Sequence, residues 1–193
     1  MPHNHLIDIS GAEITTDRIR LRPWTEADAE PALAVFGTEA VARWLAPAMT
    51  SVPDADVMRE VLRGWAAEHR DTGRPTGRWA MERTDTGQVI GGGAVLPLPP
   101  EGDDLEIGWQ LAPEVWGEGY AAEAGHALAH YAFSHGEDEV FAVVRPQNTR
   151  GVATAGRVGM EWVGETDKYY DLQLQVFRMR KGDIDIPAPR AGQ

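Results

Sequence analysis

The sequence predicts one α+β domain of mixed α/β type, with a mostly antiparallel central sheet flanked by helices. Segments that alternate between apolar and polar residues, as strands do, are interspersed with segments of helical periodicity. Three strand-like segments follow one another in the middle of the chain, which is typical of an antiparallel meander. After them helices and strands alternate, which is typical of a mixed sheet. The 193 residues suffice for a single hydrophobic core.

The first third of the chain is expected to hold an arm, one strand and three helices. Residues 1–14 show no clear periodicity and are interpreted as an irregular arm. In residues 18–24, Ile19 and Leu21 lie on one face of a strand of period two. Helices are expected over residues 25–36, 38–47 and 53–70.

These helices have recognisable ends and faces. Thr25 is expected to be the N-cap of the first helix, with acidic residues in its first turn. Pro31 lies inside that helical pattern, where proline kinks or splits a helix. The helix over 53–70 is expected to bury one apolar stripe. Its members are Val57, Val61, Leu62 and Trp65.

The middle of the chain predicts three successive strands, over residues 78–84, 88–96 and 104–111. A tight turn of sequence DTG joins the first two strands. Residues 97–104 are rich in Pro and Gly and are expected to be irregular. Three tryptophans are expected to flank a cleft, mainly as packing residues. They are Trp44, Trp65 and Trp79.

The C-terminal part predicts helix, strand, helix and then two strands. The segments are 118–134, 139–144, 148–158, 161–167 and 172–179. Residues 139–144 are apolar on both faces, as a central strand should be. Residues 182–193 are rich in Pro, Gly and small residues and are expected to be a loose tail. The predicted domain therefore spans residues 15–181.

The composition limits the possible partners and compartments. The formal net charge of −12 disfavours nucleic acid as a partner, because phosphate backbones require a basic face. It is compatible with a cationic substrate, although many acidic proteins have no such partner. No cysteine is present, which excludes disulfides, thiolate nucleophiles and cysteine zinc sites. No apolar run is long enough to span a membrane and no signal peptide is visible, so a cytoplasmic protein is expected.

Residues 117–122, with sequence GEGYAA, combine a glycine-rich turn with a helix start. Gly117 and Gly119 let backbone N–H groups approach a phosphate without a Cβ in the way. The free N–H groups of Tyr120, Ala121 and Ala122 and the positive end of the helix dipole would face the same phosphate.

The pattern G-x-G-x-x-A is also found in dinucleotide-binding proteins. Its late place in the chain and the meander before it disfavour that interpretation. Arg145, at the end of the following strand, could bind the 2′-phosphate of NADP, so an NADP-binding site stays open as an alternative.

Several motifs together resemble the GNAT acetyltransferase superfamily, over residues 15–181. They are LEIGWQLAPEVWGEGYAAEA, RPQNTRGVATAGRVGMEWVGE and the opening TDRIRLRPWTEAD. The branch that they resemble includes the ribosomal-protein N-terminal acetyltransferases of the RimJ/RimL type. The resemblance implies a GNAT-like sheet in which two parallel strands splay apart, and acetyl-CoA as the co-substrate.

The resemblance also implies a set of cofactor-binding residues. Gln110 and Leu111 would offer backbone groups to the pantetheine arm and the thioester carbonyl. Trp116, the glycines and the helix start would form the pyrophosphate site. Asn148 would contact the cofactor arm, and Arg157 would reach the adenosine phosphates, although it is equally consistent with a plain surface arginine. Glu118, where the family often has Lys or Gln, is expected to face solvent.

Glu106 is the candidate general base, because an amine must lose a proton when it attacks a thioester. It shares a strand face with Gly108 and Gln110, and the alternative is an exposed glutamate. The branch often has a serine as acid where this chain has Gly151. Tyr170, beside Tyr169, is a candidate substitute, although both tyrosines are equally consistent with pocket walls or packing.

A metal site is not expected. Glu123, His126 and His130 share a helical face, which could bind a metal, but a solvated helix face is the preferred interpretation.

The sequence therefore predicts an acetyl-CoA-dependent N-acetyltransferase that acts directly on a primary amine. The acceptor is expected to be a protein N-terminus or a small cationic amine, without nucleic acid or membrane partners. The protein is expected to be a monomer or a homodimer. Two alternatives remain open at this stage: a non-catalytic acyl-CoA-binding or sensor protein, and an NADP-dependent protein.

Overall fold

The computed structural model describes residues 6–68, 73–99 and 102–184. Over these residues one sheet has the strand order β1-β2-β3-β4-β5-β6-β7-β9-β8. The strands are β1 (Asp8–Ser10), β2 (Glu13–Thr15), β3 (Ile19–Pro23), β4 (Gly77–Arg83), β5 (Val89–Pro97), β6 (Leu105–Leu111), β7 (Glu139–Val144), β8 (Glu161–Thr166) and β9 (Leu174–Arg180). The helices are α1 (Ala29–Phe36), α2 (Glu39–Leu45), α3 (Ala55–Glu68), α4 (Tyr120–Ser134) and α5 (Thr149–Val158). Short 3₁₀ helices are η1 (Glu26–Asp28), η2 (Pro113–Val115) and η3 (Lys181–Asp183).

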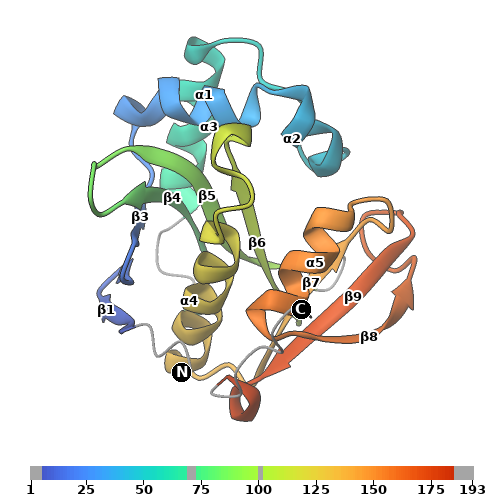
Figure 1. Ribbon diagram of the computed structural model, residues 1–193. Coiled ribbons are helices and arrows are strands. Elements are labelled where there is room, and N and C mark those ends of the chain that lie inside the picture. The colour runs from blue at the N-terminus through green and yellow to red at the C-terminus, as the bar shows by residue number, and fades with distance from the viewer. Residues whose placement is uncertain (1–5, 69–72, 100–101, 185–193) are drawn as a thin grey trace.

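The sheet splays open at β6 and β7. All other described neighbours pair antiparallel, whereas β6 and β7 pair in parallel with a register of one residue pair, Glu106 and Phe141. The strands diverge beyond that pair, and Figure 1 shows β7–β9 with α5 leaning away from the β1–β6 part. This is the predicted mixed fold, and it is not the parallel sheet that a dinucleotide-binding fold requires.

Helices cover both faces of the sheet because its strands alternate their apolar side chains. In β4, Trp79 and Met81 belong to the buried cluster that contains α4, whereas Ala80 belongs to the cluster of α1 and α3. Figure 1 shows α4 lying across one face of the sheet and α1–α3 at its upper end. In the described parts of the chain, no helix combines the length and apolarity that a membrane span requires.

The region interpreted as an irregular arm instead contains strands β1 and β2, which extend the sheet. Ile14 is fully buried, and the indole Nε1 of Trp79 donates a hydrogen bond to the Ala12 carbonyl at 2.6 Å. The strands are three residues long, too short for periodicity to reveal them. Residues 1–5 of the predicted arm and 185–193 of the predicted tail lie outside the described residues.

One expectation for the helices is wrong and another is confirmed. Val57 was placed on the buried stripe of α3 but is 42% exposed, and Met58 is fully buried in its place. Leu62 and Trp65 are buried as predicted, so the true stripe follows the spacing i, i+4, i+7 from Met58. The helix predicted over residues 25–36 is split into η1 and α1, which is one of the two outcomes expected of Pro31, and Pro31 itself lies in the first turn of α1, where a helix needs no N–H donor. Residues 69 and 70 of the predicted helix lie outside the described residues.

Candidate active site

The glycine turn before α4 exposes bare backbone. Gly117 and Gly119 have φ angles of +83° and +86°, which favour glycine. Gly119 is the N-cap residue, and α4 begins at Tyr120, two residues after the predicted start. A Cβ at Gly117 would meet nothing within 4 Å. The first N–H groups of α4 have no acceptor within the helix, so the turn can receive an anion.

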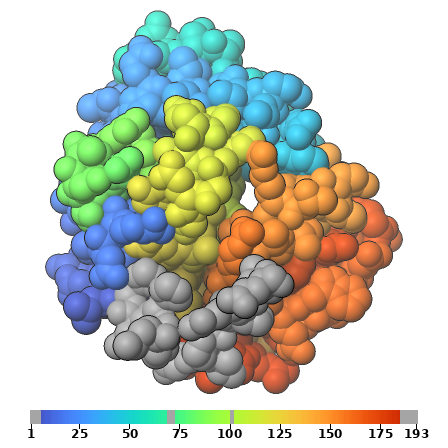
Figure 2. All heavy atoms as spheres, in the orientation of Figure 1, coloured from blue at the N-terminus to red at the C-terminus, as the bar shows by residue number. Residues whose placement is uncertain are grey.

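A second helix begins at the same end of the sheet. Since β6 and β7 are parallel and lead to α4 and α5 respectively, both helices start at the edge where the strands diverge. The guanidinium carbon of Arg150, in α5, lies 4.3 Å from the ring centre of Trp116, just before the glycine turn. In Figure 2 the surface is hollowed between the yellow segment that includes α4 and the orange segment that includes α5. The hollow can receive an extended molecule.

Glu106 and Tyr170 form a hydrogen-bonded pair at the splay. The Tyr170 hydroxyl donates to Glu106 Oε2 at 2.8 Å. Glu106 stands at the position where β6 and β7 last pair. Tyr170 has a φ of +59°, in the region that non-glycine residues rarely adopt, so the loop before β9 presents this side chain at a conformational cost. The two residues expected to carry chemistry are therefore brought together.

Burial raises the pKa of Glu106 to about 7, although the Tyr170 hydrogen bond and the positive charge of Arg78 act in the opposite direction. Burial, with the negative charge of Glu106, also raises the pKa of Tyr170, so the phenol stays protonated. A carboxyl group that titrates near neutral pH is suited to accept a proton in a reaction.

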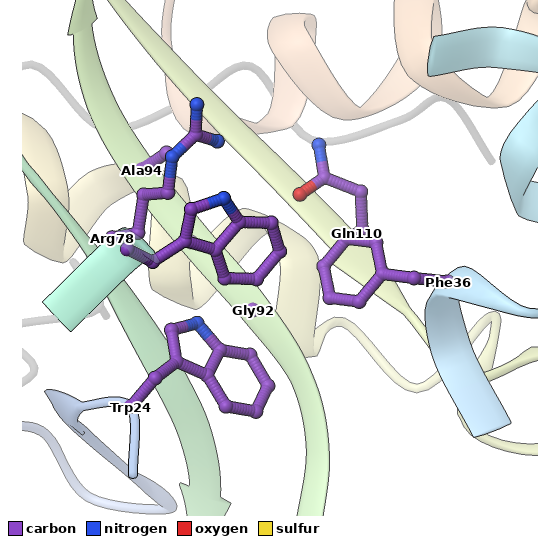
Figure 3. Close-up of a pocket in the computed structure, with 8 residues that line it drawn as sticks. Trp24, Phe36, Arg78, Gly92, Ala94 and Gln110 are labelled. Carbon is purple, nitrogen blue, oxygen red and sulfur yellow. The ribbon is translucent and has the colours of Figure 1, made fainter. Parts of the chain in front are cut away.

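A pocket lies on the face of the sheet that Glu106 shares. It is lined by Trp24, Phe36, Trp65, Arg78, Gly92, Gly93, Ala94 and Gln110. In Figure 3 the rings of Trp24 and Phe36 border the space above Gly92, and the ends of Arg78 and Gln110 point to the same side. Across the sheet, Arg78 pairs with Ala94 and Ala94 with Gly108, so the floor is made of small residues.

A sequence model of the acetyltransferase (GNAT) domain matches residues 18–161. This chain belongs to the GNAT acetyltransferase family. GNAT enzymes use acetyl-CoA, which carries an anionic pyrophosphate and a long pantetheine arm. The resemblance of the sequence motifs to this family is thereby confirmed.

Known proteins with a related sequence or structure agree with this assignment. The chain is 30% identical over 167 residues to the uncharacterized N-acetyltransferase YoaA of Bacillus subtilis (strain 168), a match that covers 81% of this chain and 86% of that protein. An acetyltransferase structure from Agrobacterium tumefaciens str. C58 is 25% identical with a TM-score of 0.72, covering 90% of this chain and 97% of that one. A structure of AAC(6')-Ib in complex with ribostamycin and coenzyme A has a TM-score of 0.70 at 16% identity, covering 91% and 100%, and shows the fold alone.

The structure fits the GNAT co-substrate at the glycine turn. With Gly117 and Gly119 at positive φ angles, the exposed turn and the helix start would offer backbone donors to a pyrophosphate. The Tyr120 ring is buried, whereas Ala121 and Ala122 are partly exposed, so this helix start offers backbone rather than side chains. Glu118 is exposed, as expected for a carboxylate next to a phosphate site.

The structure shows which groups surround the carbonyls and side chains of Gln110, Leu111 and Trp116. The Gln110 carbonyl points toward β5, where a Cβ on Gly91 would come within 2.2 Å of it. Its side chain, in contrast, lines the pocket. The Leu111 carbonyl accepts a hydrogen bond from the Trp116 indole Nε1 at 2.9 Å, and the Leu111 side chain is buried in the core. The cofactor-binding roles of these residues remain predictions.

Asn148 and Arg157 lie at opposite ends of α5. Asn148 is the N-cap residue, and its Oδ1 accepts a hydrogen bond from the Gly151 N–H at 3.0 Å. Its amide N–H₂ group, the part that can donate to an oxygen of the cofactor arm, is not used in that bond. Arg157 is exposed in the last turn, so its contact with adenosine phosphates also remains a prediction.

Replacing Gly151 by the serine typical of the branch is expected to harm the site. A Cβ at Gly151 would lie 2.8 Å from both Asn148 Nδ2 and Val144 Cγ1. Gly151→Ser should therefore displace the cap and lower the free energy of unfolding by about 1–3 kcal/mol without raising kcat. Gly156→Ser is the matched control, since a Cβ there meets nothing within 4 Å, and it should stabilise α5 by about 0.5 kcal/mol. Denaturant unfolding and steady-state rates of both variants measure these effects, and a faster Gly151→Ser enzyme would contradict the expectation.

The prediction that Glu123 lies on a solvated helix face is wrong. It is only 5% exposed, and its carboxylate accepts hydrogen bonds from Thr16 Oγ1 at 2.6 Å and from Arg18 Nε at 2.7 Å. His126 instead has its Nδ1 within 3.4 Å of the Val158 carbonyl, and within the described ranges no three potential ligands cluster for a metal ion. Arg18, Trp24 and the other non-local partners could not be predicted from the sequence, because no spacing signals a contact across the sheet.

Proposed function

We propose that this protein is an N-acetyltransferase that transfers the acetyl group of acetyl-CoA directly to a primary amine. The observation that carries the proposal is the Glu106–Tyr170 pair at the splay, 2.8 Å apart, beside a pocket on the same face of β6. The sequence motifs support it by their resemblance to the branch that includes the ribosomal-protein N-terminal acetyltransferases.

Glu106 acts as the general base in this proposal. A primary amine is mostly protonated at neutral pH and must lose a proton to attack. Glu106 accepts the proton that the ammonium group must lose before it attacks. The neutral nitrogen then forms a bond to the thioester carbonyl carbon, the carbon–sulfur bond breaks, and the second proton that the nitrogen loses goes to the departing thiolate, which leaves as CoA thiol. A carboxylate with a pKa of about 7 matches this task better than an ordinary glutamate, because a base is most effective when its pKa lies near the working pH.

Tyr170 acts as the partner of the base rather than as a separate acid. Its hydroxyl donates to Glu106 Oε2, so it orients the carboxylate and stabilises its ionised form. The CoA thiolate is a good leaving group, so we assign no dedicated proton donor to it.

The pocket favours an acceptor with a single amine. The guanidinium of Arg78 lies beside the space that an acceptor would enter, with its carbon 5.0 Å from the centre of the Trp65 ring. A polycation would meet this positive charge, whereas a peptide N-terminus or another monoamine with an apolar neighbour can pack on the aromatic walls. We therefore propose that the acceptor of the acetyl group is a peptide N-terminus or a small monoamine, in preference to an aminoglycoside.

A screen of acceptors tests the proposed function. Release of CoA thiol is followed with N-terminal peptides, monoamines and ribostamycin, and mass spectrometry locates the acetyl group. Acetylation at a primary amine supports the proposal. Tight CoA binding without turnover of any amine would favour a non-catalytic acyl-CoA-binding protein instead.

Removing the Tyr170 hydroxyl should shift the pH profile upward. In Tyr170→Phe the ionised Glu106 loses a hydrogen bond, its pKa rises further, and kcat/KM should reach half its maximum at least about half a pH unit higher than in the wild type. Tyr169→Phe is the matched control, because the Tyr169 hydroxyl donates to Asp104 Oδ2 at 3.2 Å and not to Glu106. Profiles that coincide for wild type and Tyr170→Phe would refute the pairing as a determinant of the base.

A further inference from the structure

The Arg18 side chain lies behind the glycine turn. Arg18 directly precedes β3, and its Nη1 donates to the Glu118 carbonyl at 3.0 Å while its Nε donates to Glu123 Oε2 at 2.7 Å. Its guanidinium carbon lies 4.5 Å from the centre of the Tyr120 ring. Arg18 therefore holds the turn and the first turn of α4 at three points.

The contact with Glu118 sets the direction of the next N–H group. In a trans peptide the carbonyl and the following N–H point in opposite directions. Holding the Glu118 carbonyl against Arg18 therefore turns the Gly119 N–H to the other side, away from the guanidinium. The packing is close, since a Cβ at Gly119 would lie 3.4 Å from Arg18 Nη2. A flip of this peptide would break the hydrogen bond with Arg18.

Arg18 also compensates a buried negative charge at the helix start. The Glu123 side chain is 2% exposed and lies in the first turn of α4, where an uncompensated carboxylate would repel an anion bound to the same N–H groups. The Arg18 backbone N–H, at 3.1 Å, adds to the contacts of its side chain and of Thr16 with this carboxylate. The pairing leaves the positive end of the helix available to a phosphate.

We propose that Arg18 is a positioning residue for the pyrophosphate of CoA. It acts through the Glu118–Gly119 peptide, which it orients, and through Glu123, whose charge it neutralises, and not by touching the reacting atoms. The inference rests on the use of acetyl-CoA, whereas the roles of Glu106 and of the acceptor are separate. CoA binding is measured without an acceptor, so failure of the proposed N-acetylation would not affect this test.

Calorimetric titration with CoA tests the assignment. Arg18→Ala should raise the Kd for CoA about tenfold or more, as expected when donors to an anion are misdirected. Arg18→Lys keeps a charge beside Glu123 but cannot bridge to the Glu118 carbonyl as a fork, so its Kd should lie between those of wild type and Arg18→Ala. The matched control is Arg20→Ala, two residues further along the chain, in β3. Arg20 has a similar exposure, 41% against 43%, and pairs with Glu82 at 2.9 Å.

Two comparisons separate positioning from a general structural role. Arg20→Ala should leave the Kd for CoA within about twofold of the wild type, and an equal loss in both variants would overturn the proposal. With 3′-dephospho-CoA as the probe, Arg18→Ala should show the same fold-loss as with CoA, because the pyrophosphate is unchanged. A loss that disappears with 3′-dephospho-CoA would overturn the assignment, since Arg18 would then act on the 3′-phosphate.

Discussion

Glu106→Gln should lower kcat by about 10²–10⁴-fold while the Kd for CoA stays within about twofold of the wild type. The substitution keeps the shape of the side chain and its contact with Tyr170 but removes the group that accepts the proton. Tyr170 donates to Oε2 at 2.8 Å, and an amide oxygen can accept the same bond, so the loop before β9 should keep its conformation. Steady-state rates with a saturating acceptor and calorimetry with CoA separate the two effects.

The pH dependence gives the same substitution a second readout. Because the base must be ionised, kcat/KM of the wild type should fall as the pH drops through about 7, the pKa to which burial raises Glu106. Glu106→Gln should lose this limb of the profile. The control is Asp104→Asn. Asp104 also accepts a hydrogen bond from a tyrosine, Tyr169, at 3.2 Å, but it is not the residue at which β6 pairs with β7. If Glu106→Gln and Asp104→Asn lowered kcat equally, Glu106 would not be the base.

The parts of the fold and site that could be predicted are those that depend only on residues close together in the sequence. The alternation in β6 places Glu106, Gly108 and Gln110 on one face, and that face is the one that lines the pocket. Likewise, the GEGYAA motif predicts a turn of bare backbone before a helix, and the structure has exposed glycines at 117 and 119 directly before α4. Periodicity and glycine conformation are properties of a few neighbouring residues, so one sequence suffices to reveal them.

The contacts that could not be predicted join residues far apart in the chain. The sequence predicts a solvated helix face for Glu123 and no partner for Arg18, because nothing near either of them indicates that β3 packs beside the start of α4. Val57 and Met58 are neighbours and both are apolar, so only the packing of α3 decides that Met58 rather than Val57 is buried. The Glu106–Tyr170 bond was expected only as two separate candidates, because the loop that presents Tyr170 follows no periodic pattern.

Gly119→Val should reduce the affinity for CoA about 100-fold, the second large effect that the site predicts. With φ at +86°, Gly119 has a conformation that a β-branched residue cannot adopt without strain. The added side chain would also press on Arg18 Nη2, which a Cβ alone would approach to 3.4 Å. Relief of that strain is expected to rotate the Glu118–Gly119 peptide and so to remove the N–H that we propose for the pyrophosphate. Calorimetry with CoA measures the change.

Gly136→Val is the control that separates the effect of backbone strain on stability from a loss of CoA binding. Gly136 follows α4 at its other end, has a φ of +98°, and a Cβ there would meet nothing within 4 Å. Both substitutions force a β-branched residue into the left-handed region, so both should lower the midpoint of thermal unfolding. Only Gly119→Val should also weaken CoA binding, because Gly119 belongs to the proposed pyrophosphate site and Gly136 does not. If Gly136→Val weakened CoA binding as much as Gly119→Val, the losses would come from destabilised protein, and the glycine turn would not be the pyrophosphate site.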